Sequence, residues 1–139
     1  MSIELKPLPV AGRFKIYALK TGNSCLAEEF LDIQSSQMPD EVAKMMRLLD
    51  NAARDGQPRN KEKCNTLGDK IFEFKTKKLR LAWFWDAGCI IVCSHGWIKK
   101  SQKTPTGEID RAIAARAAYF DAKDKNQIQI LTLENENKP

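Results

Sequence analysis

Residues 71–105 read IFEFKTKKLRLAWFWDAGCIIVCSHGWIKKSQKTP and contain two hairpin-like apolar runs, the only histidine and the densest basic charge of the chain. The aromatic and β-branched residues of these runs are typical of strands, and the breaks between them are typical of turns. We predict three antiparallel strands here, over 70–75, over 80–85 and from 89 to about 95. They form a small β-meander, and any functional site is expected on it.

The two faces of this meander differ in chemistry. A turn over residues 76–79 places Lys75 opposite Arg80 and Glu73 opposite Ala82, because side chains alternate along each strand. One face is then apolar and faces the helices; it carries Phe72, Phe74, Leu81, Trp83 and Trp85. The other face carries Glu73, Lys75 and Arg80.

The next turn decides on which face His95 lies. A two-residue Ala-Gly turn sends Ile90 and Val92 into the core and sets His95 across from Arg80. A three-residue turn that also includes the preceding aspartate shifts the pairing by one and reverses every side chain. We favour the two-residue turn because Ile90 and Val92 are better core residues than the cysteines beside them.

Outside the meander, the remaining strands and loops are weakly marked. Residues 1–12 are expected to form a leader with little regular structure, followed by a strand over 13–19. The polar segment 57–68 is interpreted as a loop, with at most one helical turn near its end. A last edge strand is predicted over 128–133, and 134–139 are expected to be a frayed tail.

Three helices are predicted from apolar residues at helical spacing. The first spans 24–34 with an Asn or Ser cap, the second runs from Pro39 to a stop at Gly56, and the third spans 105–122 after a Thr-Pro start. Their core-facing stripes are Leu26, Phe30 and Ile33, then Val42, Met45, Met46, Leu49 and Ala53, then Ile109, Ala112, Ile113, Ala117 and Phe120. The predicted class is α+β: an antiparallel meander packed against two N-terminal helices, with a third helix after it.

Size and composition set further bounds. The chain has 139 residues, 42% of them hydrophobic, which suits one core, and we place the domain at 13–133. No run approaches the roughly 18 apolar residues of a membrane span and no export signal is seen, so a cytoplasmic protein is expected. No glycine-rich nucleotide loop is present, and no cofactor is expected.

The four cysteines show no CxxC spacing and are interpreted as reduced thiols that act as small core residues; they are Cys25, Cys64, Cys89 and Cys93. A metal site that pairs Cys93 with His95 is the weaker alternative. No metal is therefore expected.

The positive charge is unevenly distributed. The net charge is +5, yet the window from Arg59 to Lys103 contains eleven basic and four acidic residues, so the rest of the chain is net negative. Concentrated basic charge beside aromatic residues favours a nucleic-acid partner over a membrane. A lysine-rich surface that is merely solvated is the open alternative.

The segment from Lys70 to Ala112 resembles the RelE/HigB superfamily of bacterial and phage toxins, in particular its phage-derived HigB-like branch. The shared features are an acidic-apolar-basic segment, an Arg-led strand and an H-G-W-φ-K-K-x-x-x-T-P segment (φ apolar). Here they are Glu73-Phe74-Lys75, Arg80-Leu81 and His95-Gly96-Trp97-Ile98-Lys99-Lys100-Ser101-Gln102-Lys103-Thr104-Pro105. At Glu73 the RelE pattern has a lysine, and the active-site tyrosine of some RelE members has no clear counterpart.

This resemblance implies a type II toxin that cuts messenger RNA, with or without the ribosome. It implies an antitoxin partner, commonly a helix-turn-helix protein, and contact with DNA only through the antitoxin complex. By matching positions, Arg80, Lys75 and Lys100 are expected to be catalytic.

Residue chemistry gives each candidate a role in metal-independent cleavage by the 2′-hydroxyl. His95 can act as acid or base, and Arg80 can grip two phosphate oxygens. The candidates for catalysis are Arg80, His95, Lys100 and Lys75; those for RNA binding are Lys77, Lys78, Trp97, Lys99 and Lys103; Glu73 is a possible accessory group. Two alternatives stay open: a basic RNA- or DNA-binding module without turnover, and an interaction protein that docks an acidic partner.

Overall fold

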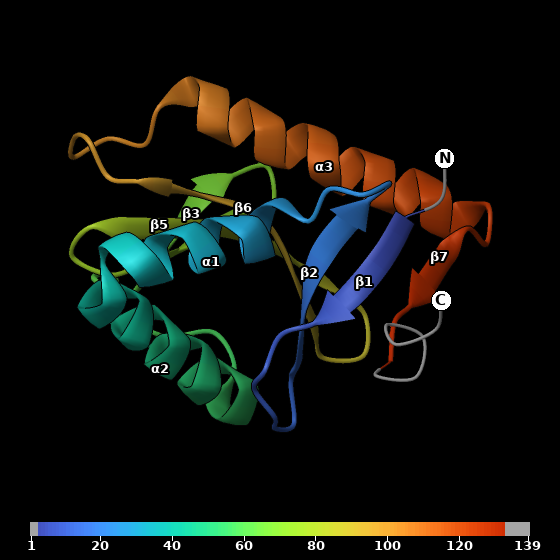
Figure 1. The fold of residues 1–139 in the computed structure, drawn as a ribbon. Helices are drawn as coiled ribbons and strands as arrows, with labels where there is room; N and C mark the ends of the chain where they lie inside the picture. The colour runs from blue at the N-terminus through green and yellow to red at the C-terminus, as the bar shows by residue number, and fades with distance from the viewer. Residues whose placement is uncertain (1–2, 133–139) are drawn as a thin grey trace.

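A seven-stranded sheet runs through the computed structural model, which describes residues 3–132 (Figure 1). The strands are β1 (Ile3–Pro7), β2 (Lys15–Thr21), β3 (Cys64–Gly68), β4 (Ile71–Lys75), β5 (Leu79–Asp86), β6 (Ile90–Ile98) and β7 (Ile128–Ile130). The helices are α1 (Leu26–Gln37), α2 (Pro39–Asp55) and α3 (Thr106–Asp124). The predicted α+β class is confirmed.

The sheet is larger than the predicted meander, and it is mixed. Its order is β3-β4-β5-β6-β2-β1-β7, with β2 parallel to β6 and β7 parallel to β1. Residues 1–12 were expected to lack regular structure, and that is wrong for β1, which pairs with both β2 and β7. Two strands therefore precede the helices: the strand predicted over 13–19 is confirmed as β2, whereas β1 was not expected. The predicted RelE-like arrangement with helices at the N-terminus is not confirmed.

The expected loop over 57–68 is also incorrect in its second half, because β3 pairs with β4 there. The signal was weak: β3 is short, polar and interrupted by an irregularity between Thr66 and Gly68, as is common in edge strands. The last strand is confirmed as β7, although it is shorter than predicted. The predicted tail at 134–139 lies outside the described residues.

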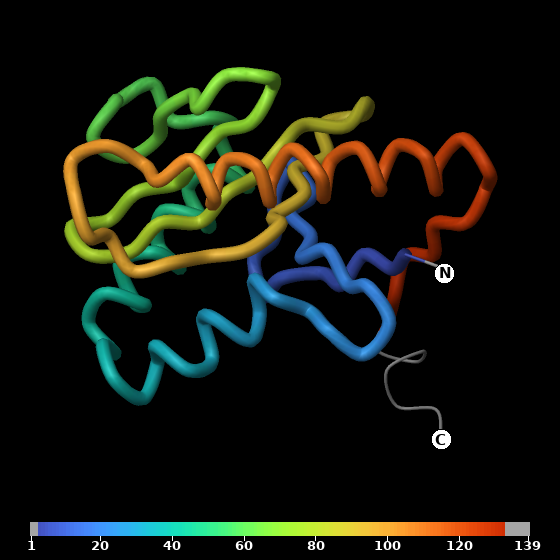
Figure 2. Tube along the Cα trace, turned by 90° about the horizontal axis from the view of Figure 1, so that it is seen from above, coloured from blue at the N-terminus to red at the C-terminus, as the bar shows by residue number. Residues whose placement is uncertain are grey.

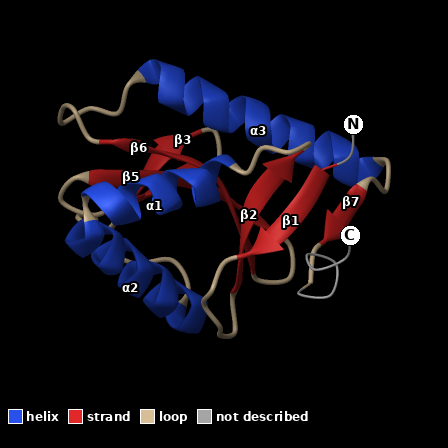
Figure 3. Cartoon of the chain, viewed as in Figure 1, coloured by secondary structure: helices blue, strands red, loops and turns tan. Residues whose placement is uncertain are grey.

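Helices cover both faces of the sheet (Figure 3). On one face α1 and α2 form a core with the strands, and this core contains Phe74, Leu81 and Trp83 of the strands together with Met45 and Leu49 of α2. On the other face α3 crosses the strands, as the view from above shows (Figure 2). This second core contains, from the helix, Ala112, Tyr119 and Ala122, and, from the strands, Ile71, Ala82, Phe84, Val92 and Trp97. The apolar meander face was predicted correctly, whereas the cover on the opposite face was not.

Neither predicted β5–β6 register is found, although the β4–β5 pairs at Lys75–Arg80 and Glu73–Ala82 are confirmed. Asp86 pairs with Ile90 around a three-residue turn at 87–89, so Ile91 and Cys93 face α1 and α2. The favoured register assumed one apolar face, whereas a sheet buried on both sides needs apolar residues on both.

A β-bulge then changes the alternation along β6. Trp83 pairs with Cys93 but Ala82 pairs with His95, so Ser94 is the extra residue. The bulge brings the side chains of Ser94 and His95 to the same side of the sheet, the side that α3 covers. His95 therefore shares a face with Arg80, but it lies opposite Ala82 and not opposite Arg80.

The predicted core stripe of the first helix is confirmed only for Phe30, which is partly buried and packs against the core. Leu26 and Ile33 are exposed at 41% and 56%, and the residues that α1 buries are Ala27, Leu31 and Gln34. The expected cap is also absent, since the N-cap is Cys25 without a side-chain bond.

Helix α2 matches its predicted bounds and stop. Its buried residues are Glu41, Met45, Leu48, Leu49, Ala52 and Ala53, so part of the predicted stripe is confirmed. In α3, Ala112 is buried, Ile113 and Phe120 are partly buried, and Ala117 is exposed.

One buried carboxylate fastens α3 to the sheet. Asp86, at the end of β5, accepts hydrogen bonds from the Tyr119 hydroxyl at 2.6 Å, from Lys123 at 2.7 Å and from the Ala87 backbone N–H. Burial alone would raise the pKa of Asp86, but these donors outweigh it and hold the pKa below its usual range. Burial and the nearby carboxylate raise the pKa of Tyr119.

No helix within residues 3–132 is long and apolar enough to cross a membrane. All four cysteines are free thiols; Cys25, Cys64 and Cys93 are buried as predicted, and Cys89 is half-buried in the turn before β6.

Candidate functional site

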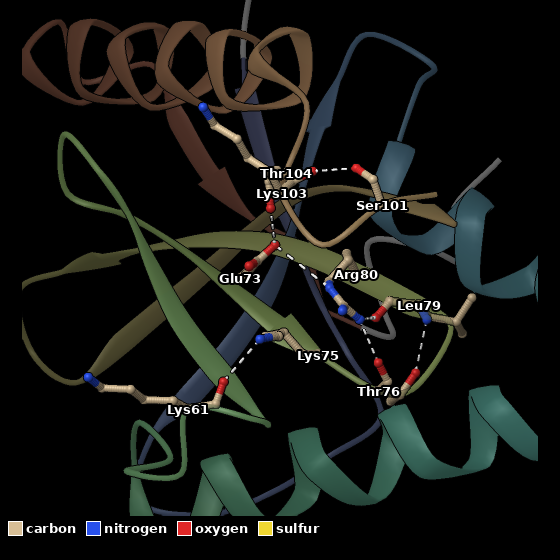
Figure 4. A network of polar contacts seen from close by, with 9 residues as sticks. All are labelled: Lys61, Glu73, Lys75, Thr76, Leu79, Arg80, Ser101, Lys103 and Thr104. Atoms are coloured by element: carbon tan, nitrogen blue, oxygen red, sulfur yellow. Dashed lines mark hydrogen bonds and ion pairs between the residues drawn. The ribbon is translucent and has the colours of Figure 1, made fainter. Parts of the chain in front are cut away.

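Arg80 is held rigidly at the start of β5 (Figure 4). Its guanidinium donates hydrogen bonds to the backbone carbonyls of Thr76 and Leu79, and its Nε lies 3.9 Å from Oε1 of Glu73. Burial lowers the pKa of Arg80, and the carboxylates of Glu73 and Glu41 oppose this effect. An arginine stays protonated at neutral pH, so the site has a fixed positive charge.

Glu73 connects the sheet to the loop that precedes α3. Its carboxylate is buried, and Oε1 accepts a hydrogen bond of 2.9 Å from the Thr104 hydroxyl. Thr104 was expected to cap α3, but the N-cap is Pro105 and no side chain caps it. The Thr-Pro segment of the motif therefore positions the loop next to Arg80.

Glu41, in the first turn of α2, ties that helix to the β4–β5 turn. Its carboxylate accepts hydrogen bonds from the Lys78 backbone N–H at 2.6 Å and the Thr76 hydroxyl at 3.2 Å, and it pairs with Lys44 at 3.3 Å. Burial tends to raise the pKa of Glu41, but these three partners outweigh it and lower the pKa. The turn whose carbonyls hold Arg80 is thus itself held by α2.

A basic pocket of about 620 Å³ opens beside Arg80, between α2, the loop before β3 and the β4–β5 turn. It is lined by Lys44, Arg47, Leu48, Asn51, Glu62, Lys63, Lys75, Thr76, Lys77, Arg80, Lys99 and Gln102. Lys75 donates a hydrogen bond to the Lys61 carbonyl at 3.1 Å. Within residues 3–132, five of the lining cations have no carboxylate partner: Arg47, Lys63, Lys75, Lys77 and Lys99. Such a concentration of unpaired positive charge favours a polyanionic ligand.

His95 does not line this pocket. Its imidazole is 3% exposed under α3, with Nε2 3.2 Å from Glu108 Oε1 and Nδ1 3.0 Å from the Ser94 hydroxyl. A carboxylate can only accept, so Nε2 carries the proton and Nδ1 accepts from Ser94. Burial, then the charge of Arg111, lowers the pKa of His95 against the opposing effect of Glu108, so the ring is neutral at pH 7. The expected convergence of imidazole and guanidinium is therefore not observed.

The remaining predicted residues lie around the pocket rather than in it. Lys78, Lys100 and Lys103 are exposed, and the side chain of Lys103 points away from Arg80 (Figure 4). Trp97 is buried in the α3 core, 5.2 Å from the His95 ring, and offers no free face for stacking on a base. The pocket thus combines Lys75, Lys77, Lys99 and Arg80 of the predicted set.

The sequence analysis missed the wall that α2 contributes to this pocket. Lys44, Arg47 and Asn51 are spaced by three and four residues and therefore share one face of the helix. Their spacing is visible in the sequence, but a polar helix face is usually exposed to solvent, and nothing local shows that it faces a lysine-rich turn. Within residues 3–132 no cluster of three or more histidine, cysteine or acidic residues could hold a metal ion.

The chain is thus a small α+β protein in which a buried arginine, fixed by backbone carbonyls, lies beside a basic pocket. The chain matches the Phage derived protein Gp49-like (DUF891) family over residues 33–127, and it belongs to that family. The family is related to the RelE/HigB toxin group, and its members are commonly toxins of toxin-antitoxin systems. No curated protein sequence matches the chain.

Proposed function

We propose that the chain is the toxin of a type II toxin-antitoxin system and that it cleaves messenger RNA at the basic pocket. The observation that supports this most is the fixed guanidinium of Arg80 beside cations without carboxylate partners. Membership of the Gp49-like family supports the toxin role, and an antitoxin is the partner that the family suggests. A helix-turn-helix antitoxin, through which any DNA contact is made, and ribosome-dependent cutting belong to the same proposal.

In this proposal the 2′-oxygen attacks the adjacent phosphorus and the bond from phosphorus to the 5′-oxygen breaks, leaving a cyclic phosphate and a free 5′-hydroxyl. Arg80 binds the phosphate through its Nη2 group, because Nη1 already donates to two backbone carbonyls and Nε faces Glu73. Lys75 stabilises the charge that develops in the transition state. Lys100 contributes from the exposed loop nearby. Water in the open pocket takes the 2′ proton and returns one to the 5′-oxygen.

His95 takes a different role in this proposal. It is a positioning residue that fixes Glu108 in the first turn of α3, and through α3 it supports the loop that carries Thr104. The proposed rate acceleration therefore comes from electrostatic stabilisation and not from an imidazole acid or base.

The absence of histidine from the lining of the pocket favours a second candidate, an RNA-binding module without turnover. Both candidates use the same residues, so product analysis is needed to separate them. The purified chain is incubated with a single-stranded RNA oligomer, with the same oligomer in all-2′-deoxy form and with chelator added, each with and without ribosomes. Cleavage supports the toxin proposal when it needs the 2′-hydroxyl, resists the chelator and leaves cyclic phosphate ends. Binding without fragments under every condition contradicts the proposal and favours the second candidate.

A further inference from the structure

Helix α2 presents a basic face that the meander motif does not account for. Met45, Leu49 and Ala52 of this helix are buried in the core. Lys44 and Arg47 line one wall of the pocket, and Arg80 lines the wall across from them. The pocket therefore has two walls that come from segments far apart in the sequence.

The two walls are fixed relative to each other. Glu41 of α2 accepts hydrogen bonds from the Lys78 backbone N–H and the Thr76 hydroxyl of the β4–β5 turn. The backbone carbonyls of Thr76 and Leu79 in turn accept hydrogen bonds from Arg80. Because Glu41 lies one turn before Lys44 on the same helix, the cations of α2 stand in a defined position beside Arg80. A ligand bound to Arg80 can therefore also contact the cations of α2 without a change in the position of the helix.

The chemistry of the lining favours phosphates over bases. Seven of the lining side chains are basic, one is acidic and none is aromatic. Base recognition in single-stranded RNA usually needs aromatic or arginine stacking platforms and polar groups at the base edges. Trp97, the nearest aromatic of the motif, is buried. The volume of about 620 Å³ exceeds what one phosphate needs and lies within the range of about 300–1,000 Å³ of ordinary ligand pockets.

We propose that Lys44 and Arg47 bind backbone phosphates next to the one held by Arg80, so that the chain recognises single-stranded RNA through its phosphates with little dependence on base sequence. The proposal rests on the proposed function in taking RNA as the ligand. It adds a second binding wall and a substrate preference that neither the motif nor the family match assigns.

The test is a binding measurement with RNA that cannot be cut. Three 2′-O-methyl oligomers of equal length and different sequence are titrated onto the full chain and onto Lys44→Gln, Arg47→Gln and Arg54→Gln. Arg54 is the matched control, since it lies on the same helix, pairs with Asp55 and does not line the pocket. Thermal unfolding checks that each variant folds.

We expect Arg47→Gln and Lys44→Gln to weaken binding about 5- to 10-fold for all three sequences, and each to reduce the slope of log affinity against log salt by about 0.7. Arg54→Gln should bind like the parent. Equal effects of Arg47→Gln and Arg54→Gln overturn the proposal, and so does a preference of the parent for one sequence above about 10-fold. If α2-dependent binding is found but unmodified RNA stays intact, the second wall stands and the proposed catalysis fails.

Discussion

The side chains of Arg80 and His95 leave the same face of the sheet, but the charged clusters around them differ in whether their charges are compensated. Around Arg80 the guanidinium is fixed by backbone carbonyls, while Arg47, Lys63, Lys77 and Lys99 face the pocket without carboxylate partners. Around His95 every polar group has a partner: Ser94 and Glu108 bond the ring, and Glu108 also pairs with Arg111 at 3.4 Å. Trp97 pairs with Arg80 across the strands and contacts the His95 ring, so it lies between the two clusters.

The difference shows that membership of one motif does not assign one role. Arg80 and His95 both belong to the segment that resembles the toxin superfamily. The buried imidazole of His95 already has a hydrogen-bond partner at each ring nitrogen, so it has little capacity left for a substrate. A cation without a partner beside an open pocket keeps that capacity. The first cluster is therefore the candidate for binding and the second for stability.

The largest expected effect is on the rate of RNA cleavage, which should depend on Arg80 and not on His95. Arg80→Lys keeps a positive charge but loses the planar fork, and we expect RNA cleavage to fall by about 100-fold. His95→Gln should keep cleavage within about 3-fold of the parent for each folded molecule. The measurement is the initial rate of RNA cleavage by each variant divided by that of the parent. Circular dichroism gives the concentration of folded protein, which is made equal in all assays. A greater loss for His95→Gln than for Arg80→Lys would reverse the assignment.

Stability should show the opposite order. His95→Ala leaves a cavity and removes the partner of both Ser94 and Glu108, so we expect the free energy of unfolding to fall by about 2–3 kcal/mol. Lys77→Ala removes an exposed side chain without a partner and should change it by less than about 0.5 kcal/mol. Urea denaturation followed by tryptophan fluorescence measures both variants. Similar values for the two would show that the His95 cluster does not support the fold.

A smaller effect concerns pH. Because the pKa of His95 is lowered in the folded chain, the unfolded chain takes up the proton first as the pH falls below about 6.5. The contribution of His95 to the free energy of unfolding is therefore fully present above about pH 6.5. It declines below that pH, by at most about 1.4 kcal/mol per pH unit. The chain has one histidine, so His95→Gln should remove this decline between pH 6.5 and 5. An unchanged pH profile in that variant would contradict the stated direction.

The sequence was informative where local pairing decides the structure. The β4–β5 pairs, helix α2 with its proline start and glycine stop, and the apolar meander face follow from alternation and capping signals within a few residues. The position of the basic window also pointed to the pocket, since Lys75, Lys77, Arg80 and Lys99 all line it.

What the sequence did not predict depends on contacts between distant segments. Pairing of β1 with β2 and β7 gives structure to a proline-containing start. Helix α3 covers the sheet face for which alternation predicted only the charged residues Glu73, Lys75 and Arg80. The bulge at Ser94 has no signature in the local sequence, yet it sets the direction of His95. Gly96 illustrates the same limit, because a Cβ there would lie 2.3 Å from the Phe30 ring of α1.

The central claim is that RNA binds in the basic pocket beside Arg80 and not at the motif histidine. Since His95 is the only histidine, its ring signals in a carbon-proton correlation spectrum report on that cluster alone, and the Arg80 Nε–H signal reports on the pocket. During titration with 2′-O-methyl RNA, we expect the Arg80 signal to shift and saturate while the His95 ring signals stay in place. A His95 shift that saturates with the RNA while the Arg80 signal stays fixed would contradict the account.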